Sequence, residues 1–199
     1  MNISSEQIKR LREKTGAGIM SCKTALLESN CNFDEAIKIL SKKGIEKAEK
    51  LLSHPTVQGV ITSYIHTGSK IGVLIEINCE TDFVARRQEF LNLAQTLAMQ
   101  IAATKEIKYI SINDIPNSIL ESERNKKSYA ATINNALQLK CNDEITISAE
   151  NSLKNYCLLN QMCLRDPNIT VDEYIKTHIA LLGENIKIKK FVKFILGEF

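Results

Sequence analysis

The sequence has few of the residue patterns on which most enzymes and metalloproteins depend. Its three histidines, His54, His66 and His178, are far apart, and none has an obvious cysteine or serine partner. A Cys-His or Ser-His nucleophile pair therefore has little support. The chain also lacks a glycine-rich loop with Walker or Rossmann spacing, so it offers no phosphate cradle of those types. We expect a protein that is not an enzyme and carries no cofactor.

Cysteine is present, but it is not arranged as a metal site. The six cysteines are at positions 22, 31, 79, 141, 157 and 163, and no two of them form a C-x-x-C pair. Their spacings match no zinc pattern, so no metal site is expected. The first residues show no basic segment followed by an apolar one, so we expect no secretory signal. Reduced structural thiols are favoured over disulfides.

Long apolar runs and a strong excess of one charge are also missing. No run approaches the ~18 apolar residues that a membrane helix needs, so no membrane contact is expected. The chain has 26 basic and 23 acidic residues, a net charge of +3, which is too balanced to predict direct nucleic-acid binding. A length of 199 residues with 44% hydrophobic residues is sufficient for a substantial core.

Residues 1–45 are predicted to form three short helices. Ser4, with a glutamine three residues later, is typical of a capping box at the first helix. The Thr15–Gly18 stretch favours a tight turn between helices over a phosphate cradle. The third helix is expected to begin after Asn32 and to end at Gly44. One side of the second helix is available for packing: Met20, Cys22, Ala25 and Leu26.

The remaining sequence predicts a mixture of strands and helices. Pro55 ends a linker helix, because the residue before a proline disfavours the helical conformation. Two strands follow, at about 57–66 and 71–79, and the second is so apolar that we expect both of its faces to be covered. Helices are predicted at 88–103 and 118–139, and a further one ends at Gly183.

The final segment, residues 184–196, is predicted to be a strand that joins the hairpin in an antiparallel sheet. Its apolar residues alternate with lysines, so one face is expected to pack while the other is solvated. The inward residues would be Ile186, Ile188, Val192, Phe194 and Leu196. The outward residues would be Lys187, Lys189 and Lys193.

The segment Asn78–Ala85 is the most informative, because a buried strand ends there in Thr81, Asp82 and Phe83. One interpretation is that Thr81 or Asp82 caps a helix and that Phe83 packs in the core. The other is an exposed wedge, in which an aromatic side chain stands beside a carboxylate on a rigid support. The pattern by itself favours the first.

Three stretches of the chain together resemble one family. Leu11–Leu26, Gly72–Ala85 and Gly183–Phe191 are similar to three signatures of translation elongation factor Ts, and they occur in that family's order. The stretches span nearly the whole chain, and each is long and specific. The resemblance reverses the preference at Phe83 and favours the exposed wedge.

The resemblance implies an α+β fold. Residues 1–45 would be a ubiquitin-associated-like three-helix domain, residues 46–55 a linker helix, and residues 56–199 an α+β core (dimerisation) domain with a small antiparallel sheet and long helices. The implied function is guanine-nucleotide exchange in translation elongation. The protein would bind elongation factor Tu in its GDP-bound and nucleotide-free forms, displace Mg²⁺ and promote exchange of GDP for GTP. The alternative is a non-exchanging interaction scaffold, a helical docking module joined to an α+β domain.

The same resemblance implies two sets of functional residues. The tip that displaces Mg²⁺ from the partner corresponds to Thr81, Asp82, Phe83 and Val84. The N-terminal helices would dock on the G domain of elongation factor Tu, and the matching residues are Arg12, Thr15, Gly16, Ala17, Gly18, Met20 and Lys23. A secondary contact with the partner's phosphate-loop region would involve Met99 and Gln100, where many relatives have a histidine. Gln100 can form a hydrogen bond but cannot titrate or stack like imidazole.

The chain has room for one core half, whereas longer relatives have two. The resemblance to the short form therefore implies a homodimer that pairs through its sheets, with two partner molecules. Frequent Asn, Ile and Lys are typical of an AT-rich genome. The plastid stroma, with an organelle-encoded gene, and the bacterial cytoplasm are both compatible with this composition.

Overall fold

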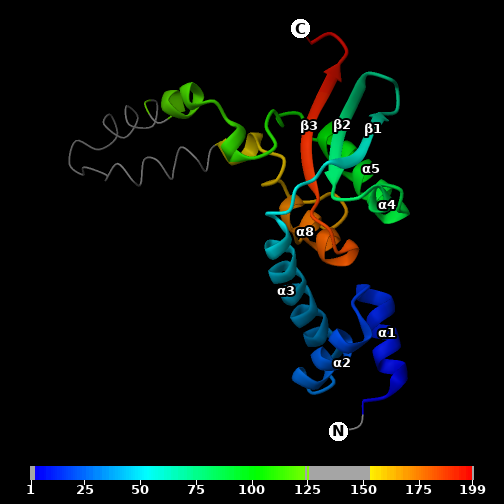
Figure 1. The fold of residues 1–199 in the computed structure, drawn as a ribbon. Helices are drawn as coiled ribbons and strands as arrows, with labels where there is room; N and C mark the ends of the chain where they lie inside the picture. The colour runs from blue at the N-terminus through cyan, green and yellow to red at the C-terminus, as the bar shows by residue number, and fades with distance from the viewer. Residues whose placement is uncertain (1–2, 124, 126–152, 199) are drawn as a thin grey trace, which may run out of the picture. The chain divides into compact units, whose positions relative to one another are not determined.

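The computed structural model describes residues 3–123, 125 and 153–198. Helices of various lengths and a three-stranded sheet in the order β1-β2-β3 confirm the α+β class (Figure 1). The elements that can be bounded are α1 (Ser5–Thr15), α2 (Ile19–Glu28), α3 (Phe33–Leu51), β1 (Gln58–Ile65), β2 (Ile71–Cys79), α4 (Asp82–Ala85), α5 (Gln88–Ala103), η1 (Ile112–Asp114), η2 (Lys154–Tyr156), α8 (Val171–Leu182) and β3 (Lys187–Ile195).

The chain divides into two compact units. Unit 1 consists of Met1–Thr62, Ile75–Gln95 and Glu173–Lys189, and unit 2 of Ser63–Leu74, Thr96–Asp172 and Lys190–Phe199. The N-terminal helices and the Asn78–Ala85 segment both belong to unit 1. The end of β3 and the hairpin turn belong to unit 2.

The helices α1, α2 and α3 of unit 1 form a small bundle, and apart from the C-terminal end of α3 their ends match the sequence prediction. Ser4 and Gln7 form the reciprocal capping box at α1. Gly16 ends α1 in the left-handed conformation, with φ of 69°, which confirms the turn at Thr15–Gly18. Asn32 caps α3 by accepting two backbone N–H groups. The buried core of the bundle consists of Leu11, Cys22, Ala25, Leu26, Ala36 and Leu40.

Two expectations for these helices are wrong. The helix predicted to end at Gly44 continues to Leu51. Glycine inside a helix costs only about 1 kcal/mol, and a Cβ at Gly44 would lie 3.3 Å from the Cβ of Ala180, so the small residue accommodates α8. Met20 does not pack with Cys22, Ala25 and Leu26, because its side chain is 71% exposed.

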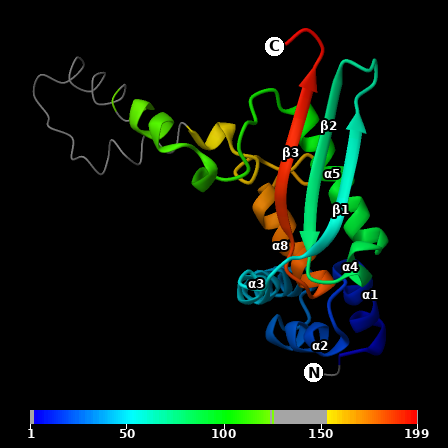
Figure 2. The ribbon, with the colours of Figure 1, turned by 45° about the horizontal axis from the view of Figure 1, so that its top comes forward.

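The sheet is antiparallel, and α5 lies on one of its faces (Figure 2). The N–H of His66 donates to the carbonyl of Ile71, which closes the β1–β2 hairpin, and the N–H of Leu196 donates to the carbonyl of Lys70. The predicted helix at 88–103 is confirmed as α5. Its buried side consists of Phe90, Leu93, Ala94, Leu97, Ala98 and Ile101.

The faces of the strands differ from the prediction. Alternate residues of β2 are buried, but Leu74 on its other face is 47% exposed, so β2 is not covered on both sides. In β3 the alternation of burial changes phase between Ile188 and Phe191. Val192, Phe194 and Leu196 therefore lie exposed, and Lys193, expected to point outward, is half-buried.

Lys193 is held on the α5 side of the sheet by backbone acceptors. Its ammonium group donates to the carbonyls of Ile101 at 3.0 Å and Thr104 at 2.9 Å. These carbonyls lie at the C-terminal end of α5, where a positive charge is favourable. Burial lowers the pKa of Lys193.

Unit 2 also contains a small separate core. Ile115, Leu153 and Cys157 are buried together, beside half-buried Tyr109 and Ile112. Residues 117–123 are helical, so the helix predicted at 118–139 is confirmed only at its start, and most of that prediction lies outside the described residues.

Candidate functional site

The segment Thr81–Val84, here named the prong, begins two residues after the end of β2 and contains the start of α4. Thr81 is the N-cap of this four-residue helix, and its side chain accepts the N–H of Val84 at 3.4 Å. Phe83 is 79% exposed, whereas Val84 and Ala85 are each only 6% exposed. The interpretation in which Phe83 packs in the core is therefore wrong, although Thr81 does cap the helix. The prong is anchored on one side and presents an aromatic ring to solvent on the other.

Asp82, the residue before Phe83, forms an ion pair with an exposed arginine. Its carboxylate accepts a hydrogen bond of 2.8 Å from the guanidinium of Arg86, whose side chain is 80% exposed. Exposed ion pairs of this kind contribute about 0.2–1 kcal/mol. The Asp82 carboxylate can therefore exchange this pairing for another donor at little energetic cost.

Two carboxylates lie beneath the prong and link it to the start of β3. Glu184 accepts the Thr81 N–H at 3.0 Å and the Thr81 hydroxyl at 2.5 Å. Glu80 accepts the N–H of Asn185 at 2.7 Å and lies 3.1 Å from Nδ1 of His54. Sequence reasoning assigned no role to these groups. The one sequence feature that could have indicated a role is that Glu80, Glu184 and Asn185 belong to the stretches that resemble the family.

The surroundings shift the pKa of two groups here. The N–H of Asn185, and then the imidazole of His54, hold the pKa of Glu80 below its ordinary value. Burial, with the nearby Glu184 carboxylate adding to it, raises the pKa of Cys79 to about 11. Glu80 is thus an ionised acceptor at neutral pH, and the Cys79 thiol stays protonated.

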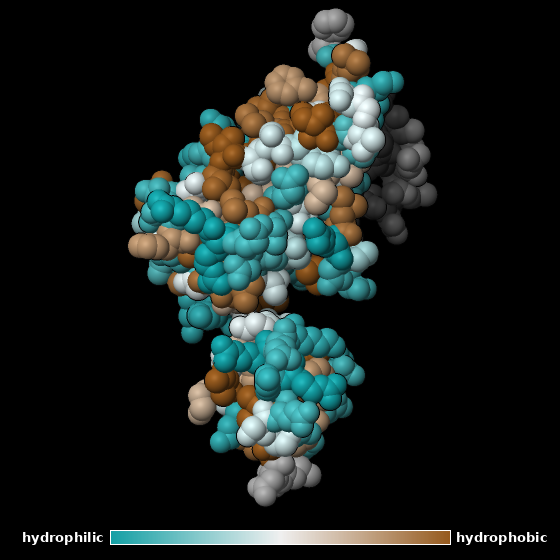
Figure 3. All heavy atoms as spheres, turned by 90° about the vertical axis from the view of Figure 1, so that its right-hand side faces the viewer, coloured by the Kyte–Doolittle hydropathy of each residue, from teal (hydrophilic) through white to brown (hydrophobic). Residues whose placement is uncertain are grey.

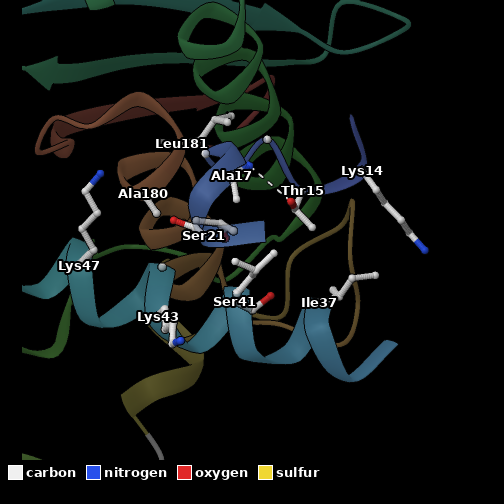
Figure 4. Close-up of a pocket in the computed structure, with 15 residues that line it drawn as sticks. Lys14, Thr15, Ala17, Ser21, Ile37, Ser41, Lys43, Lys47, Ala180 and Leu181 are labelled. Atoms are coloured by element: carbon white, nitrogen blue, oxygen red, sulfur yellow. Dashed lines mark hydrogen bonds between the residues drawn. The ribbon is translucent and has the colours of Figure 1, made fainter. Parts of the chain in front are cut away.

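A second feature of unit 1 is a pocket of about 340 Å³ that brings together Thr15, Gly16, Ala17 and Gly18 (Figure 4). The hydroxyl of Thr15 donates to the carbonyl of Leu11 at 2.7 Å and accepts the Ala17 N–H at 3.3 Å. This threonine therefore orders the turn. The pocket is also lined by residues of α3 and α8, including Ile37, Ala180 and Leu181.

The other predicted docking residues lie outside this lining. Arg12, Met20 and Lys23 are all exposed on α1 and α2. Beside Met20, Ile19 is also largely exposed. The structure thus separates the predicted docking residues into a turn with internal hydrogen bonds and an exposed surface of basic and apolar side chains.

Met99 and Gln100, the residues predicted to form the secondary partner contact, are not exposed. Met99 is half-buried, and Gln100 is 3% exposed. The Gln100 amide donates to the carbonyl of Met162 at 3.0 Å and accepts the N–H of Leu164 at 2.8 Å. Both ends of the amide are therefore used to hold the 162–164 loop on α5, and a partner contact by Gln100 stays an untested prediction.

Metal ligands, membrane spans and cysteines can be described for residues 3–123, 125 and 153–198. In these ranges no three His, Cys, Asp or Glu side chains gather as a metal-binding group. No helix there has both the length and the apolar character needed to cross a membrane. The cysteines described are free thiols, as expected: Cys22, Cys31, Cys79, Cys157 and Cys163. Cys141 lies outside the described residues.

Comparison with known proteins gives a consistent result. The sequence profile of the family described as "Elongation factor TS" matches residues 2–198. The chain is 46% identical to "Elongation factor Ts, chloroplastic" of Phaeodactylum tricornutum over 98% of this chain and 97% of that protein. It is 46% identical to "Elongation factor Ts" of Rippkaea orientalis, over 98% of this chain and 79% of that protein. The corresponding protein of Microcystis aeruginosa is 47% identical over 98% of this chain and 78% of its own length. The chain therefore belongs to the elongation factor Ts family of translation elongation factors.

Proposed function

We propose that this protein is a guanine-nucleotide exchange factor for elongation factor Tu and that its Thr81–Val84 prong drives the release of GDP. The observation that carries the proposal is the 79% exposure of Phe83. An exposed phenyl ring leaves a large apolar area in contact with water, and burial against a partner protein would remove that area from water. Its position on a short turn with buried neighbours, beside an exchangeable carboxylate, suits insertion into a partner.

The proposed mechanism acts on the metal ion of the partner. Mg²⁺ bridges phosphate and protein oxygens and so contributes strongly to GDP binding. The Phe83 ring, wedged between elements of the partner's switch region, would displace the groups that hold the ion and its waters. Asp82 would leave Arg86 and hold the displaced segment by hydrogen bonds. This protein itself makes and breaks no covalent bond.

The energetics of exchange must be reciprocal. If the factor weakens GDP binding by some ratio, GDP weakens binding of the factor by the same ratio. A thousandfold change corresponds to about 4 kcal/mol. The contacts of the prong must therefore be strongest in the nucleotide-free complex.

The helical bundle supplies the second part of the proposed contact. Ile19 and Met20 at the start of α2 are both more than half exposed, and exposed Lys23 follows one turn later. Exposed apolar side chains with polar and charged ones at their rim are typical of a docking surface. We expect this surface to contribute affinity, while the prong contributes the acceleration of release.

The test is stopped-flow release of a fluorescent GDP from elongation factor Tu. The unaltered protein should accelerate release, and Phe83→Ala should reduce the acceleration about 30-fold, as expected for the loss of a central aromatic anchor. Leu164→Ala is the matched control, because Leu164 is also an exposed apolar residue, at 55%. Binding without acceleration by the unaltered protein would support the scaffold alternative, and an unchanged rate with Phe83→Ala would refute the role of the prong.

We also propose that the protein forms a homodimer through the outer face of its sheet. In unit 2 this face exposes Ile65, Leu74, Val192, Phe194 and Leu196, and Phe194 is 67% exposed. Hydrophobic side chains stand exposed among polar ones in the space-filling view (Figure 3). A second copy would cover this apolar surface by two-fold pairing. Light scattering should give twice 22.4 kDa for the unaltered protein and for Leu164→Lys, but a monomer for Phe194→Lys.

We further propose that the protein works in a plastid stroma or a bacterial cytoplasm. The Phaeodactylum tricornutum relative is named chloroplastic, and the Rippkaea orientalis relative carries no such word. The two compartments differ in where the gene lies, so locating the coding region on a plastid or a bacterial chromosome decides between them.

A further inference from the structure

The prong is tied to the segment before β3 by a reciprocal pair of carboxylate contacts. The side chain of Glu184 accepts two hydrogen bonds from Thr81, through its N–H and its hydroxyl. In the opposite direction, the side chain of Glu80 accepts the backbone N–H of Asn185. Two consecutive residues on each segment thus exchange bonds across more than a hundred positions of sequence. We call this arrangement, Glu80 and Thr81 with Glu184 and Asn185, the clamp.

Asn185 extends the clamp to a third segment. Its amide nitrogen donates to the carbonyls of Leu52 at 3.1 Å and His54 at 2.7 Å. Asn185 is fully buried, and within the described residues its Oδ1 is the one buried side-chain polar atom that lacks a hydrogen-bond partner. An unsatisfied buried oxygen is unfavourable. The contacts of Asn185 thus fix the relative geometry of three segments, at some cost in stability.

The prong depends on external contacts for its orientation. A helix of four residues cannot hold its own conformation in water, because one turn does not compensate for the cost of helix nucleation. The ring of Phe83 is mostly exposed, so packing of that side chain does not orient it. The hydroxyl of Thr81 both caps α4, through Val84, and donates to Glu184. The clamp therefore acts on the residue that begins the helix carrying Phe83.

We propose that Glu184 is a positioning residue, which acts through Thr81 to fix the direction in which Phe83 is presented to the partner, and that Asn185 and Glu80 hold Glu184 in place. This inference rests on the proposed exchange function. Glu184 itself need not touch the partner. A carboxylate with two acceptor oxygens suits the task, because one receives the N–H and the other the hydroxyl of Thr81.

The test is a double-mutant cycle of Glu184→Ala and Phe83→Ala in the release of fluorescent GDP from elongation factor Tu. Glu184→Ala should slow stimulated release about tenfold, in keeping with the loss of hydrogen bonds to a charged acceptor. If it acts through Phe83, it should change the rate less than about twofold once Phe83 is alanine. Multiplying effects would overturn the proposal, because they would show that Glu184 acts independently of the ring.

Three further variants make the outcome specific. Glu184→Gln keeps one acceptor oxygen and should recover part of the rate, whereas Thr81→Val, which lacks the hydroxyl, should resemble Glu184→Ala. Glu46→Ala removes an exposed carboxylate of α3 and should leave the rate unchanged. Thermal unfolding of each variant shows whether it is folded, and Thr81→Val serves if Glu184→Ala is not.

Hydrogen exchange of the isolated protein separates failure of this inference from failure of the proposed function. The amides of Thr81 and Val84 should exchange about tenfold faster in Glu184→Ala than in the unaltered protein. Unchanged exchange would overturn the clamp even if nucleotide release is slowed. Faster amide exchange, together with an unchanged GDP-release rate in Phe83→Ala, would refute the role of the prong and leave the clamp as a structural tie.

Discussion

Replacing Gly16 with alanine tests whether the turn between α1 and α2 is required in its observed form. Gly16 has φ of 69°, and a Cβ there would overlap the side chain of Leu181 in α8. Two separate penalties are therefore expected, one from the backbone and one from the contact. Gly68 offers the matched control, because its φ is 89° and a Cβ there would meet nothing within 4 Å.

The expected loss in the free energy of unfolding differs between the two sites. A left-handed conformation costs a residue with a Cβ about 1–2 kcal/mol, and replacing glycine returns about 0.4–1 kcal/mol by restricting the unfolded chain. Gly68→Ala should therefore lower the free energy of unfolding by about 1 kcal/mol. Gly16→Ala should lose about 1–2 kcal/mol more, because overpacking at Leu181 is added.

The assay is urea unfolding of both variants, and of Gly16→Ala combined with Leu181→Ala. Shortening Leu181 should return most of the extra loss, since the atom in conflict is at the far end of a flexible side chain. Equal losses at Gly16 and Gly68, or no recovery in the combined variant, would show that α8 does not approach the turn as described.

Two further predictions concern ionisable groups. Burial lowers the pKa of His178, whose Nδ1 lies 2.9 Å from the carbonyl of Tyr174; the unfolded chain therefore binds the proton more readily, so stability should fall as the pH drops below about 6.5. Urea midpoints at two pH values should show this slope, and it should shrink in His178→Gln. Since the pKa of the Cys79 thiol is raised to about 11, iodoacetamide at pH 8 should modify half-buried Cys31 well before Cys79, as followed by peptide mass spectrometry; equal rates would contradict the burial of Cys79.

Local signals in the sequence were sufficient for most elements. The Ser4 capping box, the glycine turn at Gly16 and the long apolar stripe of α5 were all predicted at the observed positions. Each depends on residues within a few positions of one another, so short-range physics decides them. The end of α3 was predicted wrongly at Gly44, because the reason for this glycine is α8, which lies more than a hundred residues away in the sequence.

The side chains of β3 and of Gln100 likewise make contacts with distant segments that a local sequence pattern does not reveal. An alternating pattern predicts two faces but cannot detect a change of phase within the strand, which leaves Val192 and Phe194 exposed and turns Lys193 inward. The family resemblance predicts a partner contact for Gln100, which stays untested, and the sequence pattern did not indicate that its amide bonds the 162–164 loop. The orientation of the β3 side chains and the hydrogen bonds of Gln100 both depend on which distant segment packs against those residues.

The amino-acid sequence by itself determined the positions of most described helices and strands, several of their caps and the family, since these follow from spacing and residue type along the chain. Residue spacing left open which apolar side chains reach solvent, and apart from the family resemblance at Phe83 only the tertiary structure decided it. Phe83 and Phe90 are seven positions apart, and one is 79% exposed while the other is fully buried. The difference arises because burial is set by the segments that fold against a residue, and those segments come from elsewhere in the chain.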